Sequence, residues 1–210
     1  MKASPALIGP AAAALAAARS LAAKRDRVAI LLDGDPGIGK TAALDQLARE
    51  IGGDPFAIEH VNGQSLSVDL VRQWRERAHY GNLFSDWTVK RVDEIDSASS
   101  SAIAELLTFL DYLPARIAIL ATTNEYAKLR AQSKGRLETR FHRFQVEAPS
   151  FEETTDHLAK AFKIPKGIAQ QIARGAVPDG HLLSAGCNMR AAIKDAESYL
   201  AAIADRKEAA

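Results

Sequence analysis

Residues 34–41 form a glycine-rich segment whose residue types and spacing suit the binding of a phosphate chain. The segment follows the pattern G-x-x-x-x-G-K-[ST] and consists, in order, of Gly34, Asp35, Pro36, Gly37, Ile38, Gly39, Lys40 and Thr41. Glycines let backbone N–H groups curl around phosphate oxygens, and a helix that begins directly afterwards turns its positive end toward the same anion. The pattern predicts a nucleoside triphosphate site in which Lys40 neutralises the β and γ phosphates and the Thr41 hydroxyl binds Mg²⁺.

Two adjacent carboxylates, Asp93 and Glu94, follow a second apolar run and could divide the work of a hydrolytic site. Asp93 would hold Mg²⁺ through its water shell, while Glu94 would orient and polarise the water that attacks the γ phosphate. Such a pair alone more often caps the next helix, but the phosphate-binding segment upstream favours the catalytic interpretation. Asp96 is expected only to cap a helix that starts near Ser97.

Two further features concern the apolar run before Asp93 and a third apolar run further along the chain. Lys90 and Arg91 interrupt the run before Asp93, where a central strand would be apolar on both faces, so one of them must reach solvent or a carboxylate. A third apolar run, residues 117–122, leads into Asn124, whose amide would then lie at a strand end beside the two carboxylates. An asparagine in this position usually makes only a turn, and its order behind the other two motifs gives it weight.

The elements that must position these residues alternate between strand and helix. Apolar runs at residues 28–33, 57–61, 87–92, 117–122 and 143–146 predict five strands, and residues 40–51 predict the helix after the glycine-rich segment. Alternating strands and helices imply a parallel sheet covered on both faces, with ligands beyond the carboxyl ends of the strands. We therefore expect an α/β fold, the P-loop NTPase three-layer sandwich with a five-stranded parallel sheet.

The strand pattern stops after Pro149, and the remainder predicts three helices at residues 151–162, 165–174 and 189–204. Ser150 and Glu153 have the spacing of a capping box, and Asn188 is placed to cap the last helix. The expected domains are thus a P-loop core, residues 1–149, and a small all-helical lid, residues 150–210.

Composition sets the broad class. Of the 210 residues, 47% are hydrophobic and 25% charged, which excludes disorder and fibrous repeats, and a net charge of +1 means that any nucleic acid would have to be held by a local patch. The single Cys187 suits a reducing compartment. The Ala-rich start superficially resembles a secretory signal, but Pro5, Gly9 and Pro10 interrupt it, so a first helix and a cytoplasmic protein are expected. There is no apolar run of the roughly 18 residues needed to span a membrane.

Taken in order, residues 34–41, Asp93–Glu94, Asn124 and Asn188-Met189-Arg190 resemble the Walker A, Walker B, sensor 1 and sensor 2 elements of AAA+ ATPases, and the resemblance covers nearly the whole chain. It implies that ATP and Mg²⁺ are the cofactors and that Asn124 helps to position the attacking water. It also implies that Arg190 reaches from the lid to the γ phosphate. Leu7-Ile8-Gly9 looks like the segment of that family that packs against adenine, which makes Ile8 a nucleotide contact.

AAA+ proteins also place an arginine in the site of the neighbouring subunit, and this chain has a basic stretch in the corresponding region. Glu138 is the only acid within this stretch, whose basic residues are Lys128, Arg130, Lys134, Arg136, Arg140 and Arg143. Thr139-Arg140-Phe141 looks most like the finger, although it departs at two of three positions from the Ser-Arg-Cys of clamp loaders. Arg140 is therefore the expected finger, and Arg136 is the alternative.

Within the family, the segments around residues 61–63, 69–72 and 89–96 look closest to clamp-loader and replication-type ATPases. The chain ends soon after the lid helix, which leaves no room for the collar domain of clamp-loader subunits. Arg72, Arg75 and Arg77 around Trp74 could contact nucleic acid or could belong to an ordinary amphipathic helix.

The expected function is ATP hydrolysis in an oligomeric ring or spiral, built from this chain alone or mixed with others, that loads or remodels a nucleic-acid-associated partner. The expected partner is DNA or a DNA-bound protein, and no membrane is involved. Two alternatives stay open at this point: a P-loop kinase of a small acceptor, which accounts poorly for Asn124 and Arg190, and a nucleotide-gated scaffold that hydrolyses little ATP.

Overall fold

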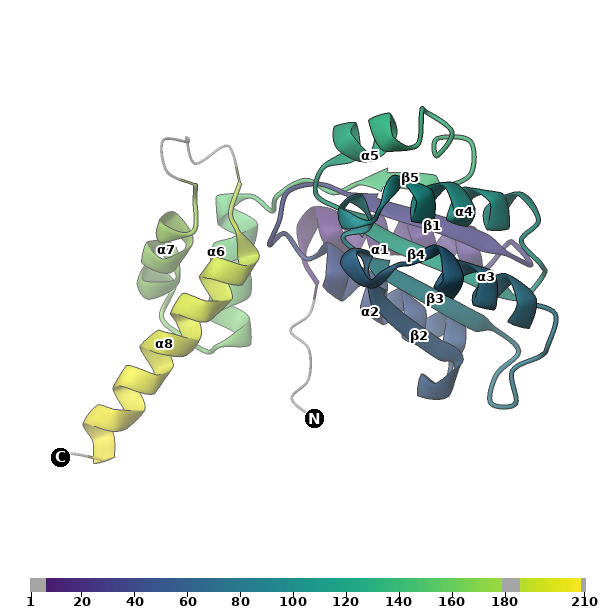
Figure 1. Ribbon diagram of the computed structural model, residues 1–210. Helices are drawn as coiled ribbons and strands as arrows, with labels where there is room; N and C mark the ends of the chain where they lie inside the picture. The colour runs from purple at the N-terminus through teal and green to yellow at the C-terminus, as the bar shows by residue number, and fades with distance from the viewer. Residues whose placement is uncertain (1–6, 179–185, 209–210) are drawn as a thin grey trace. The chain divides into compact units, whose positions relative to one another are not determined.

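The computed structural model describes residues 7–178 and 186–208 (Figure 1). The chain divides into two compact units, each of which is described by itself. The sheet unit comprises Ala14–Gly34 and Lys40–Gln145, and the helical unit comprises Met1–Ala13, Asp35–Gly39 and Val146–Ala210. The expected domain division after residue 149 stays a prediction.

The sheet unit is built on five parallel strands. They are β1 (Val28–Asp33), β2 (Ile58–Asn62), β3 (Thr88–Asp93), β4 (Ile117–Thr123) and β5 (His142–Gln145), in the spatial order β2-β3-β4-β1-β5. This confirms the predicted α/β fold with a five-stranded parallel sheet, and β1 has the predicted bounds. The other strands differ from the predicted ranges by one residue at one or both ends.

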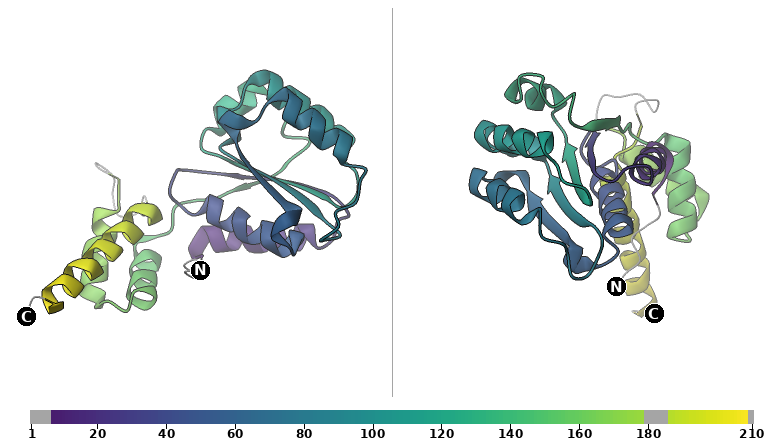
Figure 2. Two further views of the ribbon diagram at one scale, coloured as in Figure 1. Left: turned by 60° about the horizontal axis from the view of Figure 1, so that its bottom comes forward. Right: turned by 90° about the vertical axis from the view of Figure 1, so that its right-hand side faces the viewer.

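Helices cover both faces of the sheet. They are α1 (Gly9–Ala22), α2 (Lys40–Gly52), α3 (Val68–Arg77), α4 (Ser100–Asp111) and α5 (Tyr126–Gln132). Figure 2 shows α2 on one face and α3 and α4 on the other. Short 3₁₀ turns follow α2, β2 and β3: η1 (Pro55–Ala57), η2 (Gly63–Ser65) and η3 (Ile95–Ser97), respectively. The Ala-rich start forms α1, as predicted.

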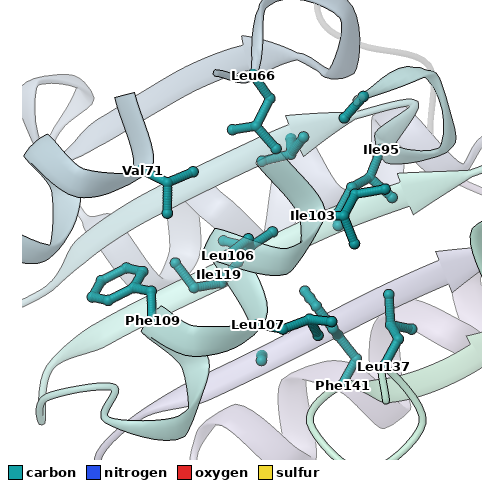
Figure 3. Packing of buried hydrophobic residues seen from close by; sticks show 14 of the residues in the cluster. Leu66, Val71, Ile95, Ile103, Leu106, Leu107, Phe109, Ile119, Leu137 and Phe141 are labelled. Atoms are coloured by element: carbon teal, nitrogen blue, oxygen red, sulfur yellow. The ribbon is translucent and has the colours of Figure 1, made fainter. Parts of the chain in front are cut away.

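The largest hydrophobic cluster fills the space between the sheet and α3 and α4 (Figure 3). Along β4, Ile117, Ile119 and Ala121 belong to this cluster, and the buried residues between them point to the opposite face. Each fully buried Leu, Ile or Phe contributes about 1.5–3 kcal/mol of transfer free energy. This cluster makes the sheet a rigid base for the side chains at its carboxyl edge.

The helical unit contains α6 (Phe151–Ala161), α7 (Lys166–Gly175) and α8 (Met189–Glu208). Its core combines Leu158 and Ile164 with small residues, among them Ala169, Ala173 and Ala192. The predicted capping box at the start of α6 is present, because the Ser150 hydroxyl accepts from the Glu153 N–H and the Glu153 carboxylate accepts from the Ser150 N–H. Within residues 7–178 and 186–208, no helix is long and apolar enough to cross a membrane.

Candidate nucleotide-binding and catalytic site

Lys40 and Asn124 meet at the carboxyl edge of the sheet. Lys40 begins α2, and its Nζ donates to the Asn124 side-chain oxygen at 2.7 Å and to the Gly34 carbonyl at 2.6 Å. Asn124 directly follows β4, which lies beside β1 in the sheet. A hydrogen bond thus joins two residues that are 84 positions apart in the sequence, and it fixes the Lys40 ammonium group at the carboxyl ends of the strands.

The glycine-rich loop has the backbone conformation that its composition predicts. Gly37 has φ 84° and Gly39 has φ 102°, values in the left-handed region that L side chains rarely adopt. Within the helical unit, the Gly37 carbonyl accepts a hydrogen bond from the backbone N–H of Arg190 at 3.1 Å, and Asn188 Nδ2 donates to the Pro36 carbonyl at 3.3 Å. The start of α8 therefore contacts the tip of this loop. Asn188 also caps α8, as predicted, because its Oδ1 accepts from the Ala191 N–H at 3.2 Å.

Asp93 ends β3, and Arg91 is its main partner. Side chains alternate along a strand, so Arg91 and Asp93 share the face that α2 covers. Arg91 Nη2 donates to Asp93 Oδ2 at 2.7 Å, and Arg91 Nη1 donates to Asp45 Oδ1 on α2 at 2.8 Å. His60 on β2 contacts the same Asp93 oxygen through Nε2 at 2.8 Å. The buried Arg91 is therefore paired with carboxylates on α2 and β3.

Lys90 finds a carboxylate as well, on the opposite face of β3. Its Nζ lies 2.5 Å from a Glu59 oxygen and 5.5 Å from the centre of the Trp74 ring, and Trp74 Nε1 donates to the other Glu59 oxygen at 2.9 Å. Burial alone would raise the pKa of Glu59, but the hydrogen bonds from Lys90 and Trp74 outweigh it and lower the pKa. The sequence required only one of Lys90 and Arg91 to reach solvent or a carboxylate, and both are paired.

Glu94 is exposed and has an unusual backbone conformation. Its φ and ψ are 53° and 52°, in the left-handed region, and its side chain makes no hydrogen bond or ion pair with the residues that the structure describes. Its backbone is fixed on both sides, because its N–H donates to Thr122 Oγ1 at 3.0 Å and its carbonyl accepts from Ser97. A Cβ at Gly63 would overlap that carbonyl, so only glycine fits there. The fixed backbone holds a free carboxylate at the strand ends.

The expectation that Asp96 caps the next helix is wrong. Ser99 caps α4, since its hydroxyl accepts from the Ala102 N–H at 3.2 Å. Asp96 is buried instead, and its Oδ1 accepts from Thr123 Oγ1 at 2.6 Å and from the backbone N–H of Asn124 at 3.1 Å. Asp96 therefore links η3, which follows Asp93 and Glu94, to the end of β4 and to Asn124.

Replacing Asp96 with Ala is expected to lower the free energy of unfolding by about 2 kcal/mol, because a buried hydroxyl and a backbone N–H lose their acceptor. Urea unfolding followed by circular dichroism measures this loss. The matched control is Asp69→Ala, since Asp69 has an 87% exposed side chain and its removal should cost no more than about 0.5 kcal/mol. Equal stabilities of the two variants would contradict the role given to Asp96.

The residues at this edge fit Mg²⁺ held through water. Asp93 Oδ2 already accepts from two side chains, whereas Oδ1 has only a long contact of 3.4 Å with Arg91 Nε, which leaves it able to accept from the water shell of an ion. The described residues contain no group of three or more His, Cys, Asp or Glu side chains that could hold a metal ion. Mg²⁺ keeps several waters and commonly uses one or two protein ligands together with phosphates. Thr41 is exposed directly after Lys40 and would be the second ligand.

Arg140 and Arg136 differ in their contacts. Arg140 forms a two-pronged ion pair with Asp111 at the end of α4, with distances of 2.6 and 3.0 Å, and it also donates to the Arg136 carbonyl. The hydrogen bond from Arg140 lowers the pKa of Asp111. The Arg136 side chain is exposed and makes no hydrogen bond or ion pair within the described part of the chain. The finger assignment between these two residues stays a prediction.

Most of the other basic residues in the basic stretch and on α3 form ion pairs. In the basic stretch, Arg130 pairs with Glu138 at 2.8 Å and Arg143 pairs with Asp33. On α3, Arg75 lies 2.9 Å from Glu105. Trp74 is buried, which agrees with an amphipathic helix whose aromatic residue belongs to the core.

Ile8 lines a pocket of about 580 Å³ within the helical unit, a size that suits a small-molecule site. The other lining residues all belong to α6: Glu153, Asp156, His157, Lys160 and Ala161. Burial lowers the pKa of the His157 imidazole.

A glycine-rich loop between β1 and α2, with a lysine at the helix start, Asp93 at the end of β3 and Glu94 directly after it, is the arrangement typical of the P-loop NTPase fold. A family model described as the ATPase family associated with various cellular activities (AAA) matches residues 30–145. The chain belongs to this AAA family. A search of curated proteins found no match.

Solved structures show the same fold at low sequence identity. A DNA polymerase III gamma subunit-related protein from Thermotoga maritima has a TM-score of 0.57 at 15% identity, over 86% of this chain and 70% of that one. The RuvB Holliday junction branch migration motor of the same organism has a TM-score of 0.62 at 19% identity, over 89% of this chain and 58% of that one. A point mutant of that RuvB has a TM-score of 0.65 at 17% identity and the same coverage. The chain thus spans little more than half the length of RuvB.

Proposed function

We propose that the chain is an AAA+ ATPase that hydrolyses ATP in an oligomeric ring or spiral and thereby loads or remodels a nucleic-acid-associated partner. The observation that carries this proposal is the hydrogen bond between Lys40 and Asn124, at the edge of the sheet where Asp93 ends β3 and Glu94 follows it. Lys40, Asp93, Glu94 and Asn124 all belong to the sheet unit, which supports the proposal that they act together.

Each of these residues has a chemical role in the proposal. Lys40 and the loop backbone bind the β and γ phosphates, and Thr41 and the water shell on Asp93 hold Mg²⁺, which neutralises charge on the phosphate oxygens. Glu94 takes the position of the base that polarises the attacking water, and Asn124 orients that water. The free carboxylate of Glu94 and the prior orientation of Lys40 by Asn124 support these roles.

The helical unit supplies the remaining nucleotide contacts in this proposal, as a lid of residues 150–210 after a core of residues 1–149. Ile8 packs against adenine, which the pocket lined by Ile8 and α6 supports. Arg190 senses the γ phosphate, which the contact between its backbone and Gly37 supports. Movement of the lid on hydrolysis would convert ATP energy into a change of grip on the partner.

Assembly completes the site in the proposal, because an arginine from a neighbouring subunit stabilises the charge that develops on the transferring phosphoryl group. Arg140 is the proposed finger and Arg136 the alternative. The partner class, DNA or a DNA-bound protein, is supported by the likeness of the fold to a branch migration motor and to a DNA polymerase III gamma-related protein.

A nucleotide-gated scaffold is the second candidate, and the pairing of Asp93 with Arg91 is the observation that favours it, because a cation already neutralises the Mg²⁺-binding carboxylate. Steady-state phosphate release separates the candidates. The proposed ATPase releases phosphate without any acceptor, and its turnover per subunit rises with protein concentration as rings assemble. ADP formation that depends on a small acceptor would indicate a kinase, and stoichiometric ATP binding without turnover would indicate a scaffold.

A further inference from the structure

Arg91 is a buried cation between two carboxylates, and the proposed mechanism gives Arg91 itself no role. Its side chain is 9% exposed, and its two terminal nitrogens hold Asp45 on α2 and Asp93 on β3. The other Asp45 oxygen lies 2.6 Å from Arg49, and the same Asp93 oxygen meets His60. The Arg91 guanidinium therefore lies between the Asp45 and Asp93 carboxylates and contacts both.

Asp45 and Asp93 share the single positive charge of Arg91. Asp93 is 13% exposed and Asp45 36%, so their repulsion in the absence of Arg91 would be only partly screened by solvent. Arg49 compensates little, because its side chain is 60% exposed and such surface pairs are weak. Without Arg91, the Asp45 and Asp93 carboxylates would lose the cation that they share, and carboxylate oxygens are ligands that suit Mn²⁺ and related divalent ions.

We propose that Arg91 is a built-in cation that occupies the space between Asp45 and Asp93 and so prevents divalent metal ions from binding at this edge before nucleotide phosphates arrive. The part of this proposal that concerns nucleotide rests on the proposed ATPase function. The part that concerns the empty protein does not, since it depends only on the charges of Arg91, Asp45 and Asp93. Arg91 also joins the helix that follows the glycine-rich loop to the strand that carries Asp93, which keeps Asp93 Oδ2 occupied and leaves Oδ1 for the water shell of an ion.

The direct test measures Mn²⁺ binding to the nucleotide-free protein by electron paramagnetic resonance. Arg91→Gln removes the charge and keeps a shorter polar side chain, and it should bind Mn²⁺ at least tenfold more tightly than the wild type, a difference of about 1.4 kcal/mol. Arg91→Lys keeps the charge and should bind Mn²⁺ as weakly as the wild type. Adding Asp45→Asn to Arg91→Gln removes one of the two carboxylates and should abolish most of the gain.

A folded Arg91→Gln protein, with a thermal unfolding curve like that of the wild type and an unchanged Mn²⁺ affinity, would overturn the proposal. So would a gain that survives in the double variant, because the ion would then bind elsewhere. This test stands even if the protein proves not to hydrolyse ATP, since no nucleotide is present.

Asp45→Asn alone keeps the proposal testable if Arg91→Gln does not fold. In this variant the Arg91 charge acts on Asp93 alone and weakens its hold on Mg²⁺. The Mg²⁺ concentration that half-saturates binding of a fluorescent ATP analogue should therefore rise at least threefold. Binding of the analogue without Mg²⁺ should change less. A merely structural role for Asp45 would change both affinities equally, and that result would count against the proposal.

Discussion

Replacing Glu94 with Gln is expected to reduce ATP turnover at least about 100-fold while ATP stays bound, because an amide cannot accept the proton of the attacking water. The structure makes this a clean substitution. The Glu94 carboxylate is exposed and makes no hydrogen bond or ion pair within the described residues, and its backbone is fixed by Thr122 and Ser97. The stability should therefore change by no more than about 0.5 kcal/mol.

Phosphate release and nucleotide retention after rapid gel filtration measure the two halves of this prediction. Glu76→Gln makes the same chemical change at an exposed residue of α3 and should leave turnover unchanged. Wild-type turnover in the Glu94 variant would show that another group activates the water. Loss of ATP binding together with turnover would show that Glu94 shapes the nucleotide site instead.

Replacing Arg140 with Ala is expected to reduce turnover about 1,000-fold, since an arginine finger supplies roughly 10³–10⁵ of the rate in related phosphoryl transfers. The substitution also removes the ion pair with Asp111, but this pair lies at the surface and such pairs contribute about 0–1 kcal/mol. Asp111→Asn controls for that loss and should keep most of the turnover. Arg136→Ala is the matched control for the alternative finger.

Mixing two inactive variants identifies the residue that acts in the neighbouring subunit. An Arg140→Ala subunit keeps Glu94 and an intact nucleotide site, while a Glu94→Gln subunit keeps the finger. In a mixed ring, some interfaces combine the two intact parts, so a mixture should recover part of the wild-type turnover although each variant alone has little. If Arg136→Ala shows the loss and the recovery in place of Arg140→Ala, then Arg136 is the finger.

The sequence predicted the fold well because its signals are local. Short apolar runs predicted the five strands to within one residue at each end, and the loop glycines were recognised by their spacing. The strand-end positions of Asp93 and Asn124 followed from the same runs. The hydrogen bond between Lys40 and Asn124 could be expected only as proximity, because it depends on the order of the strands in the sheet.

The parts that could not be predicted depend on contacts between distant elements. Asp96 has the local pattern of a helix cap, and only the pairing of β3 with β4 brings the Thr123 hydroxyl and the Asn124 N–H within its reach. The sequence indicates only an ordinary turn at Gly63. The structure shows that Gly63, directly after β2, lies against the Glu94 carbonyl. The charge of Arg91 did signal a buried partner, but nothing in the sequence near Arg91 identifies Asp45, 46 positions away on α2.

A nucleotide site shared between subunits requires assembly, and the mass of the protein in solution tests this requirement directly. Light scattering on the Glu94→Gln variant, which should hold ATP without hydrolysing it, measures that mass with ATP and Mg²⁺ and again without nucleotide, each with and without DNA. The predicted result is a multiple of the single-chain mass that forms only with ATP and Mg²⁺. A single-chain mass in every condition, combined with wild-type turnover per subunit that does not depend on protein concentration, would contradict the account.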